Sequence, residues 1–349
     1  MSNKLFALAD KLEAEGKLGR EEYLMLIENN SSEVARYLAE KALAVKEKHY
    51  GNKIFIRGLI EISNICKNDC YYCGIRKSNE NCQRYRITKE DILSCCAEGY
   101  DLGFRTFVLQ GGEDGYFSDS VLSDIVSSIK SRYPECAITL SVGERSFDSY
   151  KLLKEAGADR YLLRHETATP AHYRKLHPEN LSWERRIECL HNLKDLGYQV
   201  GCGFMVGSPG QTNEMLSDEL MFIQNFMPHM CGIGPFIPHK DTCFSAEPAG
   251  SVDMTCMLLS CIRLIHPKIL LPATTALGTM HPNGREKGIL SGANVVMPNL
   301  SPASVRKKYM LYDNKLSDGA ESAQSKNALE ERIKAIGCEI EISRGDALN

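Results

Sequence analysis

The chain lacks the long apolar runs of a membrane protein. No apolar stretch in its 349 residues approaches the roughly 18 residues that span a bilayer. Residues 1–17 mix acidic and basic side chains at helical spacing and contain no apolar region typical of a signal peptide. We therefore expect a cytoplasmic protein that makes no membrane contact.

Clustered basic charge is missing as well. The formal net charge is −3, and no long run of Lys or Arg occurs, whereas binding to nucleic-acid phosphates needs such clusters. This predicts a small substrate and no nucleic-acid partner. With 43% hydrophobic and 25% charged residues, and no repeat or low-complexity tract, the composition is that of one large globular domain.

The cysteines do not form a secreted disulfide framework. The chain has 14 of them, and many lie inside apolar runs, as Cys136, Cys202, Cys231 and Cys261 do. Such cysteines are typical of reduced, buried side chains. Their number indicates a strongly reducing cell interior.

Three cysteines stand apart from these. Cys66, Cys70 and Cys73 form a C-x3-C-x2-C run directly after an apolar stretch, and the run contains no fourth cysteine. Three thiolates would leave one iron of a four-iron cluster open to another ligand. Cys82, nine residues on, could instead close a four-cysteine zinc or electron-transfer site. The x3 spacing and the aromatic Tyr72 argue against a zinc knuckle.

The pattern of apolar residues predicts an α/β fold. Helical spacing before residue 54 predicts an N-terminal helical extension over residues 1–53. Short β-branched runs then alternate with amphipathic helices, and we expect strands at 54–62, 106–110, 137–142, 160–163, 199–206, 231–236, 269–274 and 294–297. Eight such units predict a complete (βα)8 TIM barrel over residues 54–302, with a C-terminal tail or cover over residues 303–349.

Polar residues gather where the predicted strands end, which is where the active site of such a barrel lies. The strand ends include Gln110-Gly111-Gly112, Ser141, Arg164-His165-Glu166 and Thr274-Thr275. Arg57 and Arg164 lie inside apolar strand runs, where an arginine is rarely buried without a partner. Two such arginines indicate an anionic ligand inside the barrel, and the hydroxyls of Thr139, Ser141, Thr274 and Thr275 could add hydrogen bonds to it.

The cysteine run resembles the signature of the radical S-adenosylmethionine (SAM) superfamily, C-x3-C-x-aromatic-C. The resemblance implies that Cys66, Cys70 and Cys73 hold one 4Fe-4S cluster and that SAM binds the open iron. It also implies an enzyme, in which an electron from the cluster cleaves SAM to methionine and a 5'-deoxyadenosyl radical.

Longer segments resemble the HydE-type maturases of FeFe hydrogenase. These are YLLRHETA at 161–168, GIGPFIPH at 232–239, PATTALGT at 272–279 and GANVVMPN at 292–299, within a resemblance from about residue 55 to about residue 312. The family is related to methylornithine synthase and biotin synthase and acts in building the diiron subcluster of the hydrogenase. Its substrate is thought to be an anionic iron-carbonyl-cyanide-cysteine complex made by a partner maturase, so contact with other maturases is implied.

The resemblance also implies roles for particular residues. SAM would be bound by Tyr72, Gln110, Gly111, Gly112, Glu166, Arg185 and Tyr309. The substrate cavity would be lined by Arg57, Thr139, Ser141, Arg164, Thr274, Thr275 and Met297. Some family members carry three further cysteines near the C-terminus, but residues 301–337 contain none. A second, C-terminal cluster is therefore not expected.

Two other functions stay open at this point. A methylornithine-synthase-like or biotin-synthase-like enzyme would use the same radical on an amino acid or related small molecule, and arginines and threonines would suit its carboxylate. A non-catalytic iron-sulfur carrier or scaffold would bind a cluster and pass it on. The carrier would need neither Glu166 nor Arg185, which separates it from the enzymes.

Overall fold

Strands and helices alternate along most of the chain. The computed structural model describes residues 2–317 and 322–348. The helices are α1 Ser2–Glu15, α2 Arg20–Glu28, α3 Ser32–Tyr50, α4 Lys89–Asp101, α5 Asp119–Arg132, α6 Phe147–Glu155, α7 Pro170–Leu176, α8 Trp183–Asp195, α9 Asn213–Phe226, α10 Val252–Ile265, α11 Thr275–Met280, α12 Gly284–Leu290, α13 Ala303–Arg306 and α14 Lys326–Ala335. The strands are β1 Lys53–Ile56, β2 Gly58–Ser63, β3 Thr106–Gly111, β4 Ala137–Ser141, β5 Arg160–Leu162, β6 Gln199–Cys202, β7 Met205–Val206, β8 Met230–Cys231, β9 Gly234–Pro235, β10 Val295–Val296 and β11 Glu339–Glu341.

Parallel strand pairing runs around the molecule. Six strands pair in the order β2-β3-β4-β5-β6-β8, and β1 lies between β10 and β11. Isolated parallel bridges join Met230 to Leu270, Pro272 to Val295, and Leu59 to Asn299. The pairings thus lead from β2 around to β10 and back to β1 and β2, in agreement with the predicted α/β barrel. The predicted strand at 269–274 takes part only through these single bridges.

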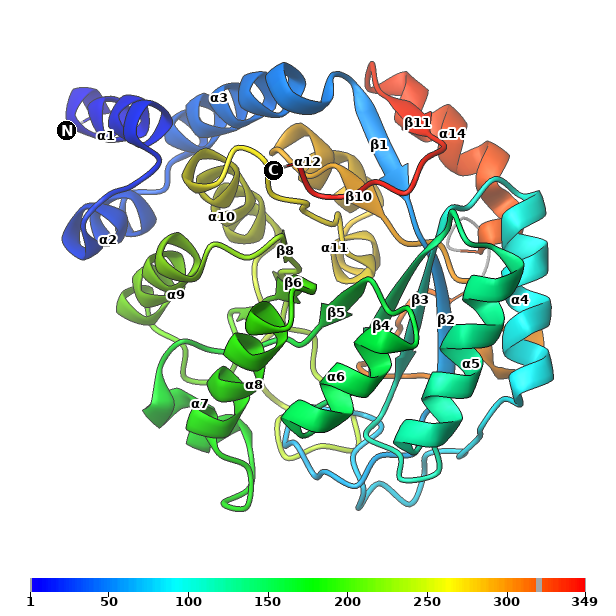
Figure 1. Cartoon of the computed structure of the whole chain (residues 1–349). Helices are drawn as coiled ribbons and strands as arrows, with labels where there is room; N and C mark the ends of the chain where they lie inside the picture. The colour runs from blue at the N-terminus through cyan, green and yellow to red at the C-terminus, as the bar shows by residue number, and fades with distance from the viewer. Residues whose placement is uncertain (1, 318–321, 349) are drawn as a thin grey trace.

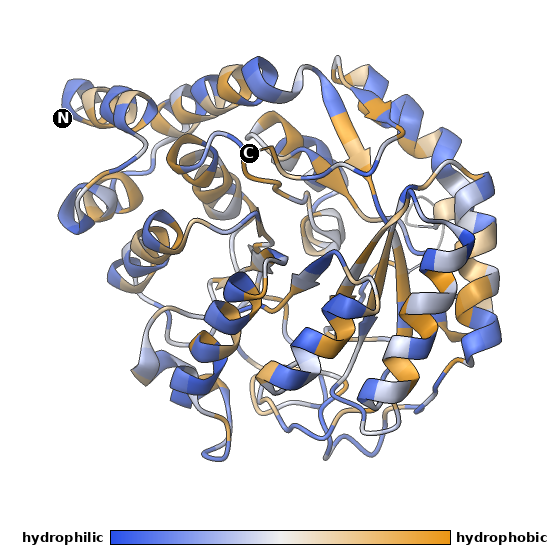
Figure 2. Ribbon diagram, in the orientation of Figure 1, coloured by the Kyte–Doolittle hydropathy of each residue, from blue (hydrophilic) through white to orange (hydrophobic). Residues whose placement is uncertain are grey.

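Helices surround the strands because each helix has one apolar face (Figure 2). Hydroxyl side chains cap several helix starts; Thr88, for example, accepts a hydrogen bond from the backbone of Asp91. Gly157 and Gly197 follow the ends of α6 and α8 with φ of 112° and 75°, a backbone region that favours glycine. Among the helices of the described residues, none is long and apolar enough to cross a bilayer.

The N-terminal helices pack on the outside of the barrel, beside α9 and α10 (Figure 1). Polar contacts help to hold them there. Arg20 Nε lies 2.6 Å from Asp218 Oδ1, and the Tyr23 hydroxyl donates to Gln224 Oε1 at 2.7 Å. The segment α1–α3 is therefore a lateral support, away from the carboxyl ends of the strands.

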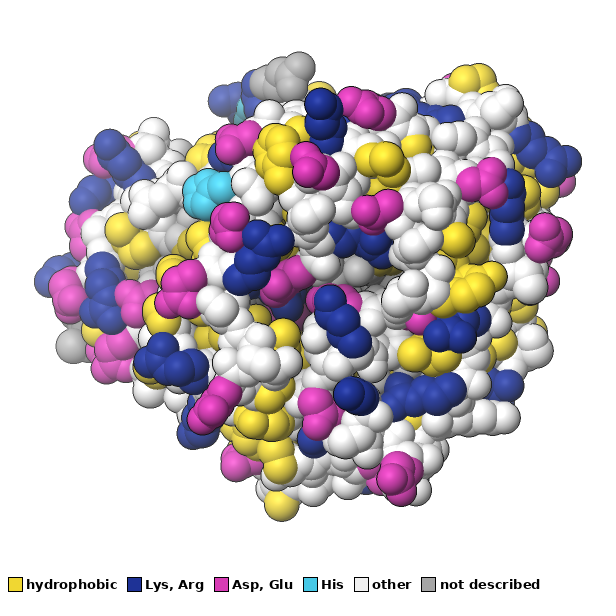
Figure 3. Space-filling view, turned by 60° about the horizontal axis from the view of Figure 1, so that its bottom comes forward, with side chains coloured by type: hydrophobic (Ala, Val, Ile, Leu, Met, Phe, Trp, Pro, Cys, Tyr) yellow, Lys and Arg dark blue, Asp and Glu magenta, His cyan; other side chains and the backbone are white. Residues whose placement is uncertain are grey.

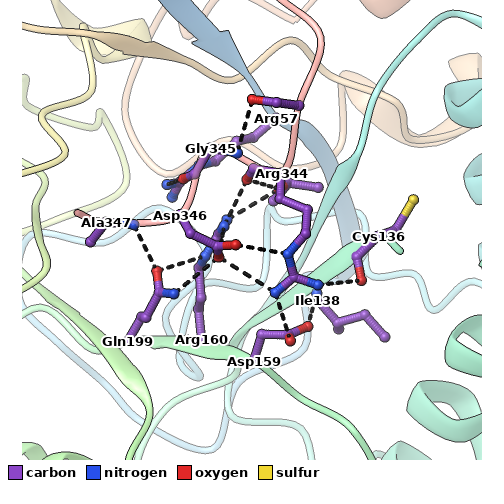
Figure 4. A network of polar contacts seen from close by, with 12 residues as sticks. Arg57, Cys136, Ile138, Asp159, Arg160, Gln199, Arg344, Gly345, Asp346 and Ala347 are labelled. Atoms are coloured by element: carbon purple, nitrogen blue, oxygen red, sulfur yellow. Dashed lines mark hydrogen bonds and ion pairs between the residues drawn. The ribbon is translucent and has the colours of Figure 1, made fainter. Parts of the chain in front are cut away.

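The C-terminal tail closes the amino-terminal end of the barrel (Figure 4). Asp346 Oδ1 accepts a hydrogen bond from Arg160 at 2.6 Å, and its Oδ2 accepts one from Arg344 at 2.8 Å. Arg160 also donates to the carbonyl of Arg344, and Arg57 donates to the carbonyl of Gly345. Since this end is filled, access to the interior is expected at the opposite end, where the strands finish.

Candidate active site at the barrel mouth

The cysteine loop follows β2 and is held at the mouth by several neighbouring loops. The backbone N–H of Lys67 donates to the carbonyl of Glu113, that of Tyr71 to Leu176, and that of Gly74 to Leu311. Arg84 fastens the loop from within, because its guanidinium donates to the carbonyls of Asn64, Ile75, Arg76, Lys77 and Asn79. The loop is therefore fixed in place by the fold itself.

The three loop cysteines are partly buried, and their environment favours the protonated, neutral thiol. Burial raises the pKa of Cys66 and Cys70, and it raises the pKa of Cys73 to about 12. Metal binding would have to displace these protons. Cys66 Sγ also accepts a hydrogen bond from the backbone N–H of Glu113 at 3.4 Å.

Cys82 is held differently from the three loop cysteines. Its Sγ accepts a hydrogen bond from Asn64 Nδ2 at 3.5 Å. Within the described residues, no three Cys, His, Asp or Glu side chains converge closely enough to hold a single metal ion.

Tyr72 fastens the loop to the barrel. Its hydroxyl lies 3.3 Å from His177 Nε2, and His177 Nδ1 lies 3.0 Å from the carbonyl of Tyr173. The carbonyl can only accept, so Nδ1 carries the proton and the Tyr72 hydroxyl donates to Nε2. Burial lowers the pKa of His177 to about 3, which keeps the imidazole neutral. Tyr72 thus links the cysteine loop to the end of α7 through His177.

The end of β3 approaches the cysteine loop closely. A Cβ on Gly112 would lie 2.3 Å from the carbonyl oxygen of Ile65 and 2.8 Å from Cβ of Cys66, so only glycine fits. At Gly111 the space is less restricted, with the nearest atom at 3.2 Å. Gln110 Nε2 donates to the Tyr309 hydroxyl at 3.4 Å. The structure therefore brings the predicted SAM residues of β3 and the C-terminal segment together.

Glu166 lies at the end of the predicted strand 160–163 in an unusual backbone conformation, with φ of 65°. Its Oε2 lies 3.2 Å from Nη2 of Arg164, an ion pair without the angle of a directed hydrogen bond. Burial and then the negative charge of Glu166 raise the pKa of Tyr72, the aromatic residue of the cysteine loop. Arg164 and Glu166 therefore both lie at the mouth, where residues at the carboxyl ends of the strands are expected.

Arg185 and Arg186 differ sharply in their surroundings. Arg185 is 39% exposed in its side chain and donates to Glu188 and to the carbonyl of Arg145. Arg186 is buried, with Nε 2.5 Å from Glu144 Oε1. Burial by itself lowers the pKa of Arg186, but the neighbouring Tyr173 and Glu144 raise it overall, so the guanidinium stays charged.

Buried polar atoms without a hydrogen-bond partner gather at this place. In the described part of the chain they include Arg164 Nε and Tyr173 Oη, whereas Glu144 Oε1 lies 2.5 Å from Arg186 Nε and Glu166 Oε2 lies 3.2 Å from Arg164 Nη2, each as an ion pair. Leaving such an atom unsatisfied costs about 1–3 kcal/mol, so the cluster is suited to a polar ligand. Two guanidinium groups and two carboxylates could bind the ammonium and carboxylate of an amino acid. The mouth face is hollowed near its centre and carries side chains of both charges (Figure 3).

The predicted substrate residues are spread along the barrel. Ser141 ends β4, and Thr274 precedes α11, with its hydroxyl donating to the carbonyl of Ile233. Thr275 begins α11. These three lie on the mouth side with Arg164.

Other members of the same set lie lower. Arg57 and Thr139 line a small cavity of about 10 Å³ together with Arg160, near the tail. Met297 packs beside the apolar cluster of Tyr50, Phe55, Met230, Leu270 and Val295. The set is thus divided between an upper group at the mouth and a lower group near the amino-terminal end.

Two further charged residues lie at the mouth beside those predicted from the sequence. Arg186 directly follows Arg185, and the buried positions of α8, Cys189, Leu190 and Leu193, indicate which face of the helix turns inward. Glu144 follows Gly143 at the end of a predicted strand and could have been found by the same rule that singled out Glu166. Its backbone N–H is held by Glu113 Oε1 at 3.0 Å.

Comparison with known proteins gives matches over most of the chain. A sequence profile described as the Radical SAM superfamily matches residues 60–223. The FeFe hydrogenase maturase subunit HydE of Thermotoga maritima is 47% identical over 272 residues, 78% of this chain and 77% of that protein. The 3-methylornithine synthase of Methanosarcina barkeri is 28% identical over 316 residues, 89% of this chain and 88% of that protein.

Solved structures share the fold. Methylornithine synthase PylB superposes with a TM-score of 0.83 at 26% identity, over 96% of this chain and 97% of that chain. HydG, a maturase of FeFe hydrogenase, superposes with a TM-score of 0.82 at 21% identity, over 98% of this chain and 77% of that chain. Both superpositions support the barrel described above.

Proposed function

Because the chain belongs to the radical SAM superfamily and, within it, to the HydE-type maturases, we propose that it acts in assembling the diiron site of FeFe hydrogenase. The observation that carries this proposal is the 47% identity to the HydE of Thermotoga maritima over 78% of the chain. The family implies a 4Fe-4S cluster and SAM, and the thiols and the unsatisfied polar atoms at the mouth suit both.

We assign the cluster to Cys66, Cys70 and Cys73. When bound, the reduced cluster and SAM supply a 5'-deoxyadenosyl radical. Tyr72 and Gly112 hold the loop against the barrel. Beyond Cys261 the sequence contains only Cys338, so we propose a single cluster.

We assign the amino-acid part of SAM to the charged residues of the mouth. Glu166 would accept from its ammonium, and Arg186, held by Glu144, would donate to its carboxylate. Gln110 and Tyr309, which touch each other, would lie beside the nucleoside. The small anionic substrate would then be bound inside the barrel by Arg164 and the hydroxyls on the mouth side.

Arg186→Met and Glu166→Gln are each expected to weaken SAM binding by about tenfold or more, because losing a buried charged partner costs about 1.5–3 kcal/mol. Arg185→Ala tests the residue predicted from the sequence. Because that side chain is 39% exposed and paired with Glu188, its SAM affinity should stay within about twofold of wild type if Arg186 is the carboxylate partner. Equilibrium binding to the reconstituted protein measures this. If Arg185→Ala weakens binding and Arg186→Met does not, the assignment predicted from the sequence holds instead.

A maturation assay tests the function itself. Anaerobic protein is added to an extract that contains the hydrogenase apoprotein and the other maturases but no HydE, and hydrogenase activity is measured. We expect activity to appear only with SAM and a reductant present. The structural match to methylornithine synthase PylB favours one alternative, so lysine is offered in parallel. Conversion of lysine to methylornithine without hydrogenase activation would give the assignment to that alternative.

A further inference from the structure

The stretch that carries Glu166 is held from behind by a buried carboxylate. Glu219 and His165 are both completely buried, and Glu219 Oε2 lies 2.8 Å from His165 Nε2. The other carboxylate oxygen, Oε1, accepts the backbone N–H of Ala168 at 2.8 Å. Glu219, from α9, therefore fixes residues on both sides of Glu166 although it lies outside the mouth.

The hydrogen bonds set the tautomer of His165. The backbone N–H of Gly203 donates to His165 Nδ1 at 3.3 Å, so Nδ1 must be the acceptor and the proton lies on Nε2. Nε2 then donates to Glu219. Two donors, His165 Nε2–H and Ala168 N–H, thus face one carboxylate, and only a group with two acceptor oxygens satisfies both.

Glu166 needs such support because of its backbone. Its φ of 65° lies in the left-handed region, which costs energy for a residue other than glycine and persists only where neighbouring structure holds it. Its own N–H donates to the carbonyl of Gly203 at 3.0 Å, and Trp183 Nε1 donates to the carbonyl of Thr167 at 2.9 Å. The stretch is therefore held by hydrogen bonds on the side away from the mouth, while the Glu166 carboxylate lies beside Arg164 at the mouth.

We propose that Glu219, acting through His165 and Ala168, is a positioning residue that holds Glu166 in its strained conformation for SAM binding. This rests on the proposed function, which assigns Glu166 to SAM. Glu219 does not touch the mouth; it acts by keeping the 165–168 stretch in the shape that presents the Glu166 carboxylate.

Glu219→Gln tests the proposal, because the amide offers one acceptor where two donors need one each. We expect iron content to be unchanged and the dissociation constant for SAM to rise roughly three- to tenfold. Without SAM, hydrogen exchange of the amides of residues 163–169 should become faster. Adding Glu219→Gln to Glu166→Gln should raise the dissociation constant less than about twofold further, since both changes remove the same contact.

Asp218→Asn on the same helix is the matched control, because Asp218 pairs with Arg20 on the outside. It should leave SAM affinity unchanged. Glu219→Asp keeps the charge but is one methylene too short to reach both donors; it replaces Glu219→Gln if that variant fails to fold, and should also weaken SAM binding. The proposal is overturned if the foldable variants bind SAM like wild type while Glu166→Gln does not. If Glu166→Gln itself binds SAM normally, the assignment of Glu166 to SAM is wrong. That outcome differs from one in which only the Glu219 variants bind SAM like wild type.

Discussion

Replacing any one of Cys66, Cys70 and Cys73 by Ala is expected to abolish the cluster. Wild-type protein reconstituted without oxygen should contain about four irons per chain, and each variant close to none, because a four-iron cluster held by three thiolates cannot spare one. The visible absorption of the cluster and iron analysis both measure this. The variants should still fold, since the loop is fastened by Arg84 and by backbone hydrogen bonds that do not involve the thiols.

Cys82→Ala is the control for these variants. Cys82 accepts a hydrogen bond from Asn64 and is not needed in a three-cysteine site. We expect this variant to keep its cluster and its SAM binding. Loss of the cluster in Cys82→Ala, or stoichiometric zinc in place of iron after anaerobic purification, would favour the closed four-cysteine site.

Much of the barrel was predictable because its signals are local. A strand of β-branched residues followed by an amphipathic helix is visible in the sequence wherever the strand is long enough, as in β3 Thr106–Gly111 and β4 Ala137–Ser141. The segment 269–274 was predicted as a regular strand but contributes only single bridges at Leu270 and Pro272. Apolar periodicity reports burial, and it does not distinguish regular strand pairing from a buried extended segment.

The mouth was only partly predictable, because its remaining features depend on orientation. Arg185 and Arg186 are neighbours at the start of a helix, so their side chains point about 100° apart, and a pattern of letters does not say which faces the thiols. The positions of β11 and the tail could not be predicted either. Asp346 contacts Arg160, which lies 186 residues earlier in the chain, and no local sequence pattern predicts such a contact.

Depth within the barrel also required the structure. Arg57 and Arg164 look alike in the sequence, as arginines in apolar strand runs. In the fold Arg164 contacts Glu166 at the mouth, whereas Arg57 lies beside Gly345 and Met230 near the amino-terminal end. Arg57 is completely buried, and burial lowers its pKa. A charge in such a place is retained at a cost, which points to a role other than stability.

The variants Arg164→Met and Arg57→Met therefore test whether each arginine serves function and not stability. Met keeps the apolar volume and removes a guanidinium whose Nε has no hydrogen-bond partner among the described residues at either position. For Arg57→Met we expect a thermal unfolding midpoint equal to or above that of wild type, because replacing a poorly paired buried charge by an apolar group is often neutral or stabilising by about 1–4 kcal/mol. Both variants should still bind the cluster.

Hydrogenase maturation should fall sharply in Arg164→Met, by about tenfold or more, if Arg164 binds the anionic substrate through a charged hydrogen bond. In Arg57→Met it should fall only if the substrate reaches the lower group of residues near the amino-terminal end. Arg164→Met should in addition weaken SAM binding, since Arg164 contacts Glu166, and Arg57→Met should not. Lys130→Met is a control for the loss of a charge at the amino-terminal end, because Lys130 pairs with Asp159, which also pairs with Arg344 of the tail. Maturation that survives both arginine substitutions would mean that neither contacts the substrate. If Arg57→Met loses maturation activity only in proportion to its loss of folded protein, the role of Arg57 is structural, as a partner of the C-terminal tail.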